Sequence, residues 1–132
     1  MKAVNKLLNA ADQALKTTKI VSNSGKVEEV NKGYISGFGP SVISSGLIPA
    51  LAFYLSDANK SPIIDAIAQT LSPGNSSSVT NSGHILFRAV LQLENNRMQL
   101  NLEKERIINA SIALKIMMRT YDFIKTQNSA NV

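Results

Sequence analysis

Three basic residues near the C-terminus share one helical line, and their spacing suits contact with phosphate groups. At 3.6 residues per turn, Lys104, Lys115 and Arg119 fall within one narrow stripe. Ser111 lies between them and Asp122 at the end, so the stripe is predicted to be the only polar side of an otherwise apolar helix. Spaced cations of this kind can each neutralise a phosphate without reading a base. The stripe therefore indicates either a nucleic-acid contact or an ordinary solvated face.

A second basic line is predicted near the N-terminus, where a solvated face is the stronger interpretation. It consists of Lys2, Lys6 and Lys16. The aromatic residues fall at the spacing of a helical core, which does not favour base stacking. They are Tyr34, Phe38, Phe53, Tyr54, Phe87, Tyr121 and Phe123. Any nucleic-acid contact is thus expected to be electrostatic and independent of sequence.

Catalysis or metal binding requires a cluster of suitable side chains, and the sequence pattern shows none. The single histidine, His84, follows Gly83 at a predicted helix start, where a capping or solvent-exposed role is favoured over a general base or ligand. The acidic residues considered for catalysis are spread among the predicted helices. They are Asp12, Asp57, Asp65, Glu94, Glu103, Glu105 and Asp122. We expect a protein that is not an enzyme and needs no cofactor or metal.

The composition favours one small basic domain. A chain of 132 residues can bury a single core, so one domain over residues 1–132 is predicted. Fourteen Lys and Arg against nine Asp and Glu give a formal net charge of +5, which favours polyanionic partners such as nucleic acid or an acidic membrane surface. The absence of cysteine excludes disulfides and thiolate metal sites. Polar residues interrupt the first turns, so no secretory signal is expected and the cytoplasm is the default location.

The elements that must position the basic residues are predicted to be helices. Apolar residues recur at helical spacing over residues 2–20, and again from about Lys26 to Gly46. Strand signals are weak. The fold class is therefore all-α, as a compact bundle of about five to six helices.

The boundaries of the later helices follow from local signals. Ser61 and Pro62 offer an N-cap and a first helical residue for a short helix over 62–71. The Ser/Asn/Gly/Pro composition of residues 72–83 indicates a flexible loop. A helix then runs from His84 towards a break at Asn95 and Asn96, followed by a long central helix over 98–126. A frayed tail is expected at 127–132.

Residues 33–56 carry no charge yet contain four glycines and two prolines. Their length makes them a formal membrane-span candidate, but only 13 of the 24 residues are hydrophobic. The pair Gly37 and Gly39 lacks the further glycine and lysine of phosphate-binding loops. A helical hairpin accounts for the stretch best, with Pro40 kinking one helix, Gly46 ending it and Pro49 opening the next.

A family resemblance lies mainly in this hairpin. The segments YISGFGPSVISSGLIPALAFYLS (34–56) and ALKIMMRTYDFIK (113–125) resemble the small helical subunit of the Cmr complex, the type III-B CRISPR effector that binds target RNA. The resemblance is sharpest from Tyr34 to Leu55. The residues in the family's order are Pro40, Gly46, Leu47, Ala50, Leu51, Ala52, Phe53 and Leu55.

The resemblance implies a non-catalytic role in antiviral defence. In that family, copies of the subunit stack beside the backbone subunits and help to line the groove in which guide RNA pairs with target RNA. Membership would make other Cmr subunits, copies of this chain, guide RNA and target RNA the partners, and no membrane would be involved. The alternative is a basic peripheral membrane or adaptor protein whose N-terminal helix lies on anionic lipid.

Overall fold

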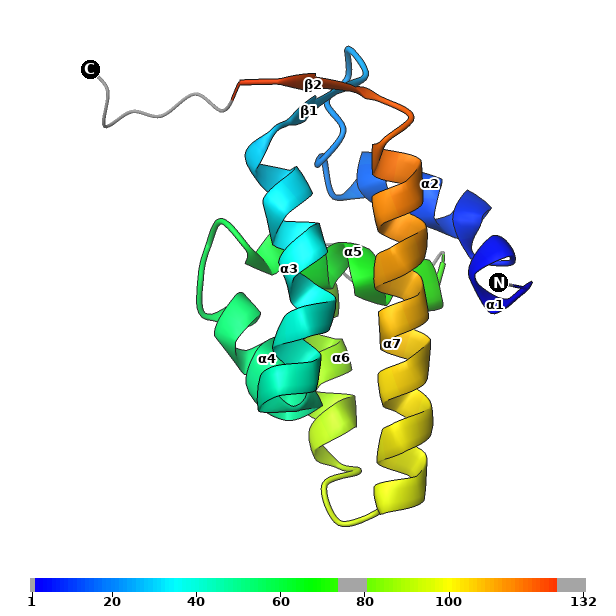
Figure 1. Cartoon of the computed structure of the whole chain (residues 1–132), viewed down its shortest axis with the longest axis vertical. Coiled ribbons are helices and arrows are strands. Elements are labelled where there is room, and N and C mark those ends of the chain that lie inside the picture. Colours follow the sequence, from blue (N-terminus) through cyan, green and yellow to red (C-terminus); the bar gives the residue numbers. More distant parts are fainter. Residues whose placement is uncertain (1, 74–80, 126–132) are drawn as a thin grey trace.

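The computed structural model of the chain describes residues 2–73 and 81–125 (Figure 1). These ranges contain seven α-helices and one small parallel sheet of two strands. In chain order the elements are α1 (Lys2–Asn5), α2 (Leu8–Thr17), β1 (Lys26–Glu28), α3 (Val30–Ser45), α4 (Leu47–Leu55), α5 (Ser61–Leu71), α6 (Ser82–Leu91), α7 (Arg97–Met118) and β2 (Asp122–Ile124). The prediction of a compact, mainly helical bundle is confirmed, although the described helices outnumber the expected five to six.

The prediction of one helix over residues 2–20 is wrong. The chain turns between α1 and α2, where the N–H of Leu7 donates to the carbonyl of Val4 at 2.9 Å. This bond spans three residues instead of four, so it tightens the backbone and ends the first helix. Both pieces pack against α7, and α2 also packs against α5.

Two further helix boundaries are wrong because of the parallel sheet. Residues 26–28 form β1 instead of opening a helix, and the long C-terminal helix ends at Met118, with residues 122–124 forming β2. The central pair of the sheet is Val27 with Phe123. Val27 is fully buried. Burial of the Val27 side chain stabilises the strand more than the helical tendency of its neighbours would stabilise a helix.

The most buried helix is α5, which crosses behind α3 and α7 (Figure 1). Every residue from Ile63 to Thr70 is buried, as expected of a helix enclosed on all sides. The C-terminal half of α7, from Ile107 to Met118, supplies much of the remaining core. The N-terminal half of α7 is mostly exposed, so the prediction of a central long helix is correct for one half only.

The uncharged stretch forms the predicted helical hairpin. Helix α3 runs through Pro40 to Ser45, and Gly46 separates it from α4. Gly46 has φ 95° and ψ 162°, a conformation that essentially only glycine adopts. The hydroxyl of Tyr54 closes the hairpin by donating to the carbonyl of Tyr34 at 2.7 Å. In the part of the chain that the structure describes, no helix combines the length and apolar character of a membrane span.

The remaining boundaries are close to those predicted. The break at Asn95 and Asn96 is confirmed, because α6 ends at Leu91 and α7 begins at Arg97. Ser61 is the first residue of α5 and not its N-cap, which is Lys60. The predicted loop over 72–83 ends early, since Ser82 and Gly83 belong to α6. Residues 74–80 of that loop and the predicted tail at 127–132 lie outside the described residues.

Candidate nucleic-acid interface

The formal charge of the chain is concentrated in one part of the fold. Residues 57–106 carry five basic and five acidic side chains, so this segment, here called the neutral segment, has no net charge. The other basic residues number nine and face only four acidic ones, which accounts for the whole net charge of +5. We call these nine the basic set: Lys2, Lys6, Lys16, Lys19, Lys26, Lys32, Lys115, Arg119 and Lys125.

The fold brings most of the basic set towards one end of the molecule. Helix α2, both strands and the C-terminal half of α7 gather in the upper part of Figure 1, and α1 lies at mid-height beside α7. Helix α7 packs against α1 and α2, and β1 pairs with β2. Residues from both ends of the chain thereby contribute to one positively charged region. Such a region attracts polyanions over distances of about a Debye length, roughly 8 Å at physiological salt.

Lys115 and Arg119 lie at the C-terminal end of α7. Lys115 is in the last turn and Arg119 is the C-cap residue, where a positive charge suits the helix dipole. Arg119 is exposed and Lys115 is half-buried. Among the described residues, no carboxylate lies within 4 Å of either side chain. Their charges are therefore available to an outside partner.

The predicted stripe along α7 is interrupted. Ser111 is 5% exposed, and its hydroxyl donates to the carbonyl of Ile108 at 2.7 Å. The helix face between Lys104 and Lys115 therefore packs into the core, so the prediction of one continuous polar side is wrong. Lys104 is exposed in the neutral segment, about 16 Å along the helix from Lys115 at 1.5 Å per residue.

Asp122 does not extend this stripe, because it belongs to β2 and not to α7. Its carboxylate pairs with Lys26 of β1 at 3.1 Å, so the ion pair links the two strands. Both side chains are substantially exposed, and such pairs contribute little to stability. The pair does reduce the charge that Lys26 offers to a partner.

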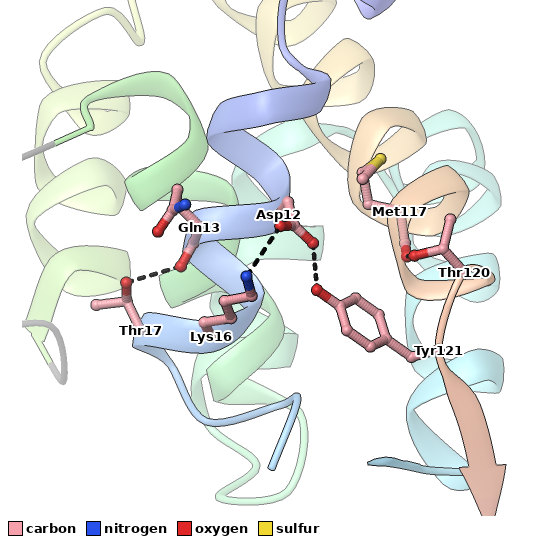
Figure 2. A network of polar contacts seen from close by, with 7 residues as sticks. All are labelled: Asp12, Gln13, Lys16, Thr17, Met117, Thr120 and Tyr121. Carbon is pink, nitrogen blue, oxygen red and sulfur yellow. Dashed lines mark hydrogen bonds and ion pairs between the residues drawn. The ribbon is translucent and has the colours of Figure 1, made fainter. Parts of the chain in front are cut away.

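The N-terminal candidates do not form one line either. Lys2 lies in α1 and Lys6 in the turn after it, and both are exposed. Lys16 lies in α2 and pairs with Asp12 at 3.3 Å (Figure 2). Asp12 also accepts a hydrogen bond from the hydroxyl of Tyr121. Of the six residues predicted from the sequence, Lys16 is the one for which the described residues provide an ion-pair partner.

Sequence reasoning missed four members of the basic set. Lys19, Lys26, Lys32 and Lys125 join the same end of the fold, although they share no helical line. Lys32 lies over the ring of Phe123, with its Nζ 5.5 Å from the ring centroid. The uneven distribution of charge along the chain could have identified these four lysines, because counting charges requires no knowledge of the fold.

One aromatic residue departs from the predicted core role. Phe53 is 58% exposed, whereas Phe38 and Tyr54 are buried as expected. The Nζ of Lys60 lies 4.7 Å from the Phe53 ring centroid and within 6 Å of the rings of Tyr34 and Tyr54. This arrangement fixes the turn before α5 onto the hairpin through cation–π contacts.

Two of the groups considered for catalysis, His84 and Asp65, lie near each other in the structure. His84 is exposed in α6. Asp65 is buried, and its Oδ1 accepts from the backbone N–H of Gly83 at 2.8 Å. Burial raises the pKa of Asp65, while the Gly83 N–H and the charge of His84 oppose that shift. Within residues 2–73 and 81–125, no three His, Cys, Asp or Glu side chains are grouped so as to hold a metal ion.

Comparison with protein-family models, with curated proteins and with solved structures finds no match to this chain.

Proposed function

We propose that this protein is a non-catalytic small subunit of a type III-B CRISPR effector complex, in which it contacts RNA phosphates through the basic set. The observation that carries the proposal is the segregation of charge. The whole net charge of +5 lies outside the neutral segment, at an end where Lys115 and Arg119 have no carboxylate partner among the described residues. Such a surface binds a phosphate backbone without sequence preference.

The resemblance to the small Cmr subunit supports the assignment to this type of complex. The residues that carry it, from Tyr34 to Leu55, form a helical hairpin around Gly46. Gly46 adopts a backbone conformation that favours glycine, and the Tyr54 hydroxyl donates a hydrogen bond to the Tyr34 carbonyl. Both features stabilise the hairpin. Under this proposal the partners are other Cmr subunits, copies of this chain, and guide and target RNA, in the cytoplasm.

A large exposed apolar side chain near the hairpin turn is consistent with contact between subunits. Ile43 lies three residues before Gly46 and is 83% exposed. Exposed apolar side chains of this size are common at protein interfaces. The hairpin would thus serve assembly, while the basic set would serve RNA binding.

Co-purification tests the proposed function. The full chain with an affinity tag is co-expressed with the other subunits of a Cmr complex and a guide RNA. We expect the subunits and the guide to purify with this chain, and the assembled complex to retain single-stranded RNA on a filter. In parallel, the purified chain is mixed with liposomes of anionic lipid and floated. A chain that floats with lipid, and that neither joins the complex nor contributes to RNA retention, would be the peripheral membrane protein instead.

A further inference from the structure

A cavity of about 410 Å³ lies between α5, α6 and α7, in the neutral segment. Helix α6 packs against α5 and α4, whereas α7 packs mainly against α1, α2, α3 and α5. The two antiparallel helices α6 and α7 therefore leave space between them, and α5 forms its floor. The volume falls in the range of small-molecule sites, about 300–1,000 Å³.

The cavity wall is mainly apolar. Leu71 of α5 and Ile85, Leu86 and Ala89 of α6 contribute aliphatic surface. Ile85 is 51% exposed, although it is a large apolar residue. An apolar body placed in the cavity would remove this surface from water, which is favourable in proportion to the area covered.

The charged residues of the cavity wall neutralise each other. Both carboxylate oxygens of Glu103 accept from Nη1 of Arg106, at 2.9 and 2.7 Å. They are the only ionisable side chains among the described residues that line the cavity. The site therefore favours an uncharged occupant, because the charges of Glu103 and Arg106 already pair with each other and leave no opposite charge for a charged ligand.

One buried polar side chain of the wall has no hydrogen-bond partner among the described residues. Gln69 is 7% exposed and lines the cavity. No hydrogen bond joins its carboxamide to another residue of the described ranges. Since every fully enclosed polar side-chain atom in those ranges has a partner, the amide atoms of Gln69 keep some accessible surface, and Gln69 is one of the residues that line the cavity. An amide offers a donor and an acceptor side by side.

From these contacts we infer that the cavity binds a small uncharged amphipathic molecule, whose apolar body packs on α6 and whose amide group pairs with the Gln69 carboxamide. A primary or cyclic amide supplies the donor and acceptor that Gln69 lacks. A ligand of about a dozen non-hydrogen atoms matches the space. The site is separate from the basic set, so this binding does not depend on the proposed RNA contact.

The test uses two probes of equal size in NMR titrations of the full-length ¹⁵N-labelled chain. The first is 4-phenylbutanamide, and the second is 5-phenylpentan-2-one, which keeps the acceptor but lacks the N–H donors. We expect the amide to shift resonances of residues lining the cavity with a Kd of about 1 mM, and the ketone to bind about tenfold more weakly. Equal binding of the two probes, or no shifts with the amide at about ten times that concentration, would overturn the inference.

Two variants and a control locate the binding. Gln69→Leu is expected to remove the preference for the amide while binding of the ketone persists. Ala89→Phe fills the cavity from an exposed position on α6 and should abolish binding of both probes. Ala52→Phe, at an exposed position on α4 outside the cavity, should leave both affinities unchanged. Amide binding that survives Ala89→Phe with native helix content, or that Ala52→Phe removes equally, would show that the cavity is not the site.

Discussion

The hydroxyl of Tyr121 donates a hydrogen bond to the carboxylate of Asp12 and so connects the segment before β2 with α2 (Figure 2). The two residues lie 109 positions apart in the sequence. Asp12 also pairs with Lys16 on the next turn of its helix. This contact joins the N-terminal and C-terminal parts of the basic set, and it orients the chain between Arg119 and β2.

Replacement of Tyr121 by phenylalanine should weaken the fold without changing its helix content. Tyr121→Phe removes a hydrogen bond to a charged, half-buried acceptor, and we expect a loss of about 1 kcal/mol in the free energy of unfolding. Urea denaturation followed by circular dichroism measures this loss. Tyr34→Phe is the control, because no partner of the Tyr34 hydroxyl is seen among the described residues, and its effect should be within about 0.5 kcal/mol. Equal losses in the two variants would contradict the role of the Asp12 contact.

The same contact predicts a pH dependence. The hydrogen bond to Asp12, followed by burial and the charge of Asp12, raises the pKa of Tyr121 from 10.0 to about 12. A folded-state pKa above the unfolded value means that the stabilisation is fully present below pH 10 and is lost as the pH rises towards 12. The difference in stability between wild type and Tyr121→Phe should therefore shrink over this interval. A difference that stays constant from pH 9 to about pH 12 would contradict the assigned pKa.

Gly46 should tolerate no side chain. Its φ of 95° with ψ 162° is strained for any residue with a Cβ, so Gly46→Ala should cost about 1–3 kcal/mol. Gly33→Ala is the matched control on α3, where an added Cβ would meet nothing within 4 Å and should gain about 0.5–1 kcal/mol from helix propensity. Thermal unfolding measures both. A Gly46→Ala protein as stable as Gly33→Ala would show that the hairpin does not require this backbone conformation.

Gly83 of α6 lies in close contact with Asp65 of α5. An added Cβ would lie 2.7 Å from Oδ1 and 3.1 Å from the backbone nitrogen of Asp65. Gly83→Ala must therefore displace α6 or break the bond from the Gly83 N–H to Asp65, at an expected cost of about 2 kcal/mol. Gly33→Ala, which meets nothing within 4 Å, serves as the control for thermal unfolding. A Gly83→Ala protein that melts at the wild-type temperature would contradict this packing.

The sequence predicted the elements whose signals are local. The hairpin around Gly46 and the break before Arg97 depend on glycine, proline and asparagine at particular positions, and these act within a few residues. The pairing of Val27 with Phe123 could not be predicted in this way, because the partners are 96 residues apart and each strand has only three residues. Without this pairing, the helical pattern of residues 119–126 looked continuous.

The candidate site was predicted in part for the same reason. Lys115 and Arg119 were identified because they share a helix face. Ser111 was misjudged because a buried serine can satisfy its hydroxyl within its own helix, as the bond to Ile108 shows. Lys26 and Lys125 lie outside the helices, so no helical periodicity could reveal them.

The central claim is that RNA contacts the basic set and not the neutral segment. The most direct measurement is the salt dependence of single-stranded RNA binding by the assembled complex, with two charge-reversed variants of equal net charge. One is Lys115→Glu with Arg119→Glu. The other is Arg97→Glu with Lys104→Glu, at exposed positions of the same helix within the neutral segment.

The first variant should flatten the slope of log K against log salt by about 1.4, which corresponds to two lost phosphate contacts at about 0.7 each. The second should leave the slope at the wild-type value. Equal changes in both variants, or an unchanged slope in the first, would contradict the claim that the basic set binds the phosphate backbone.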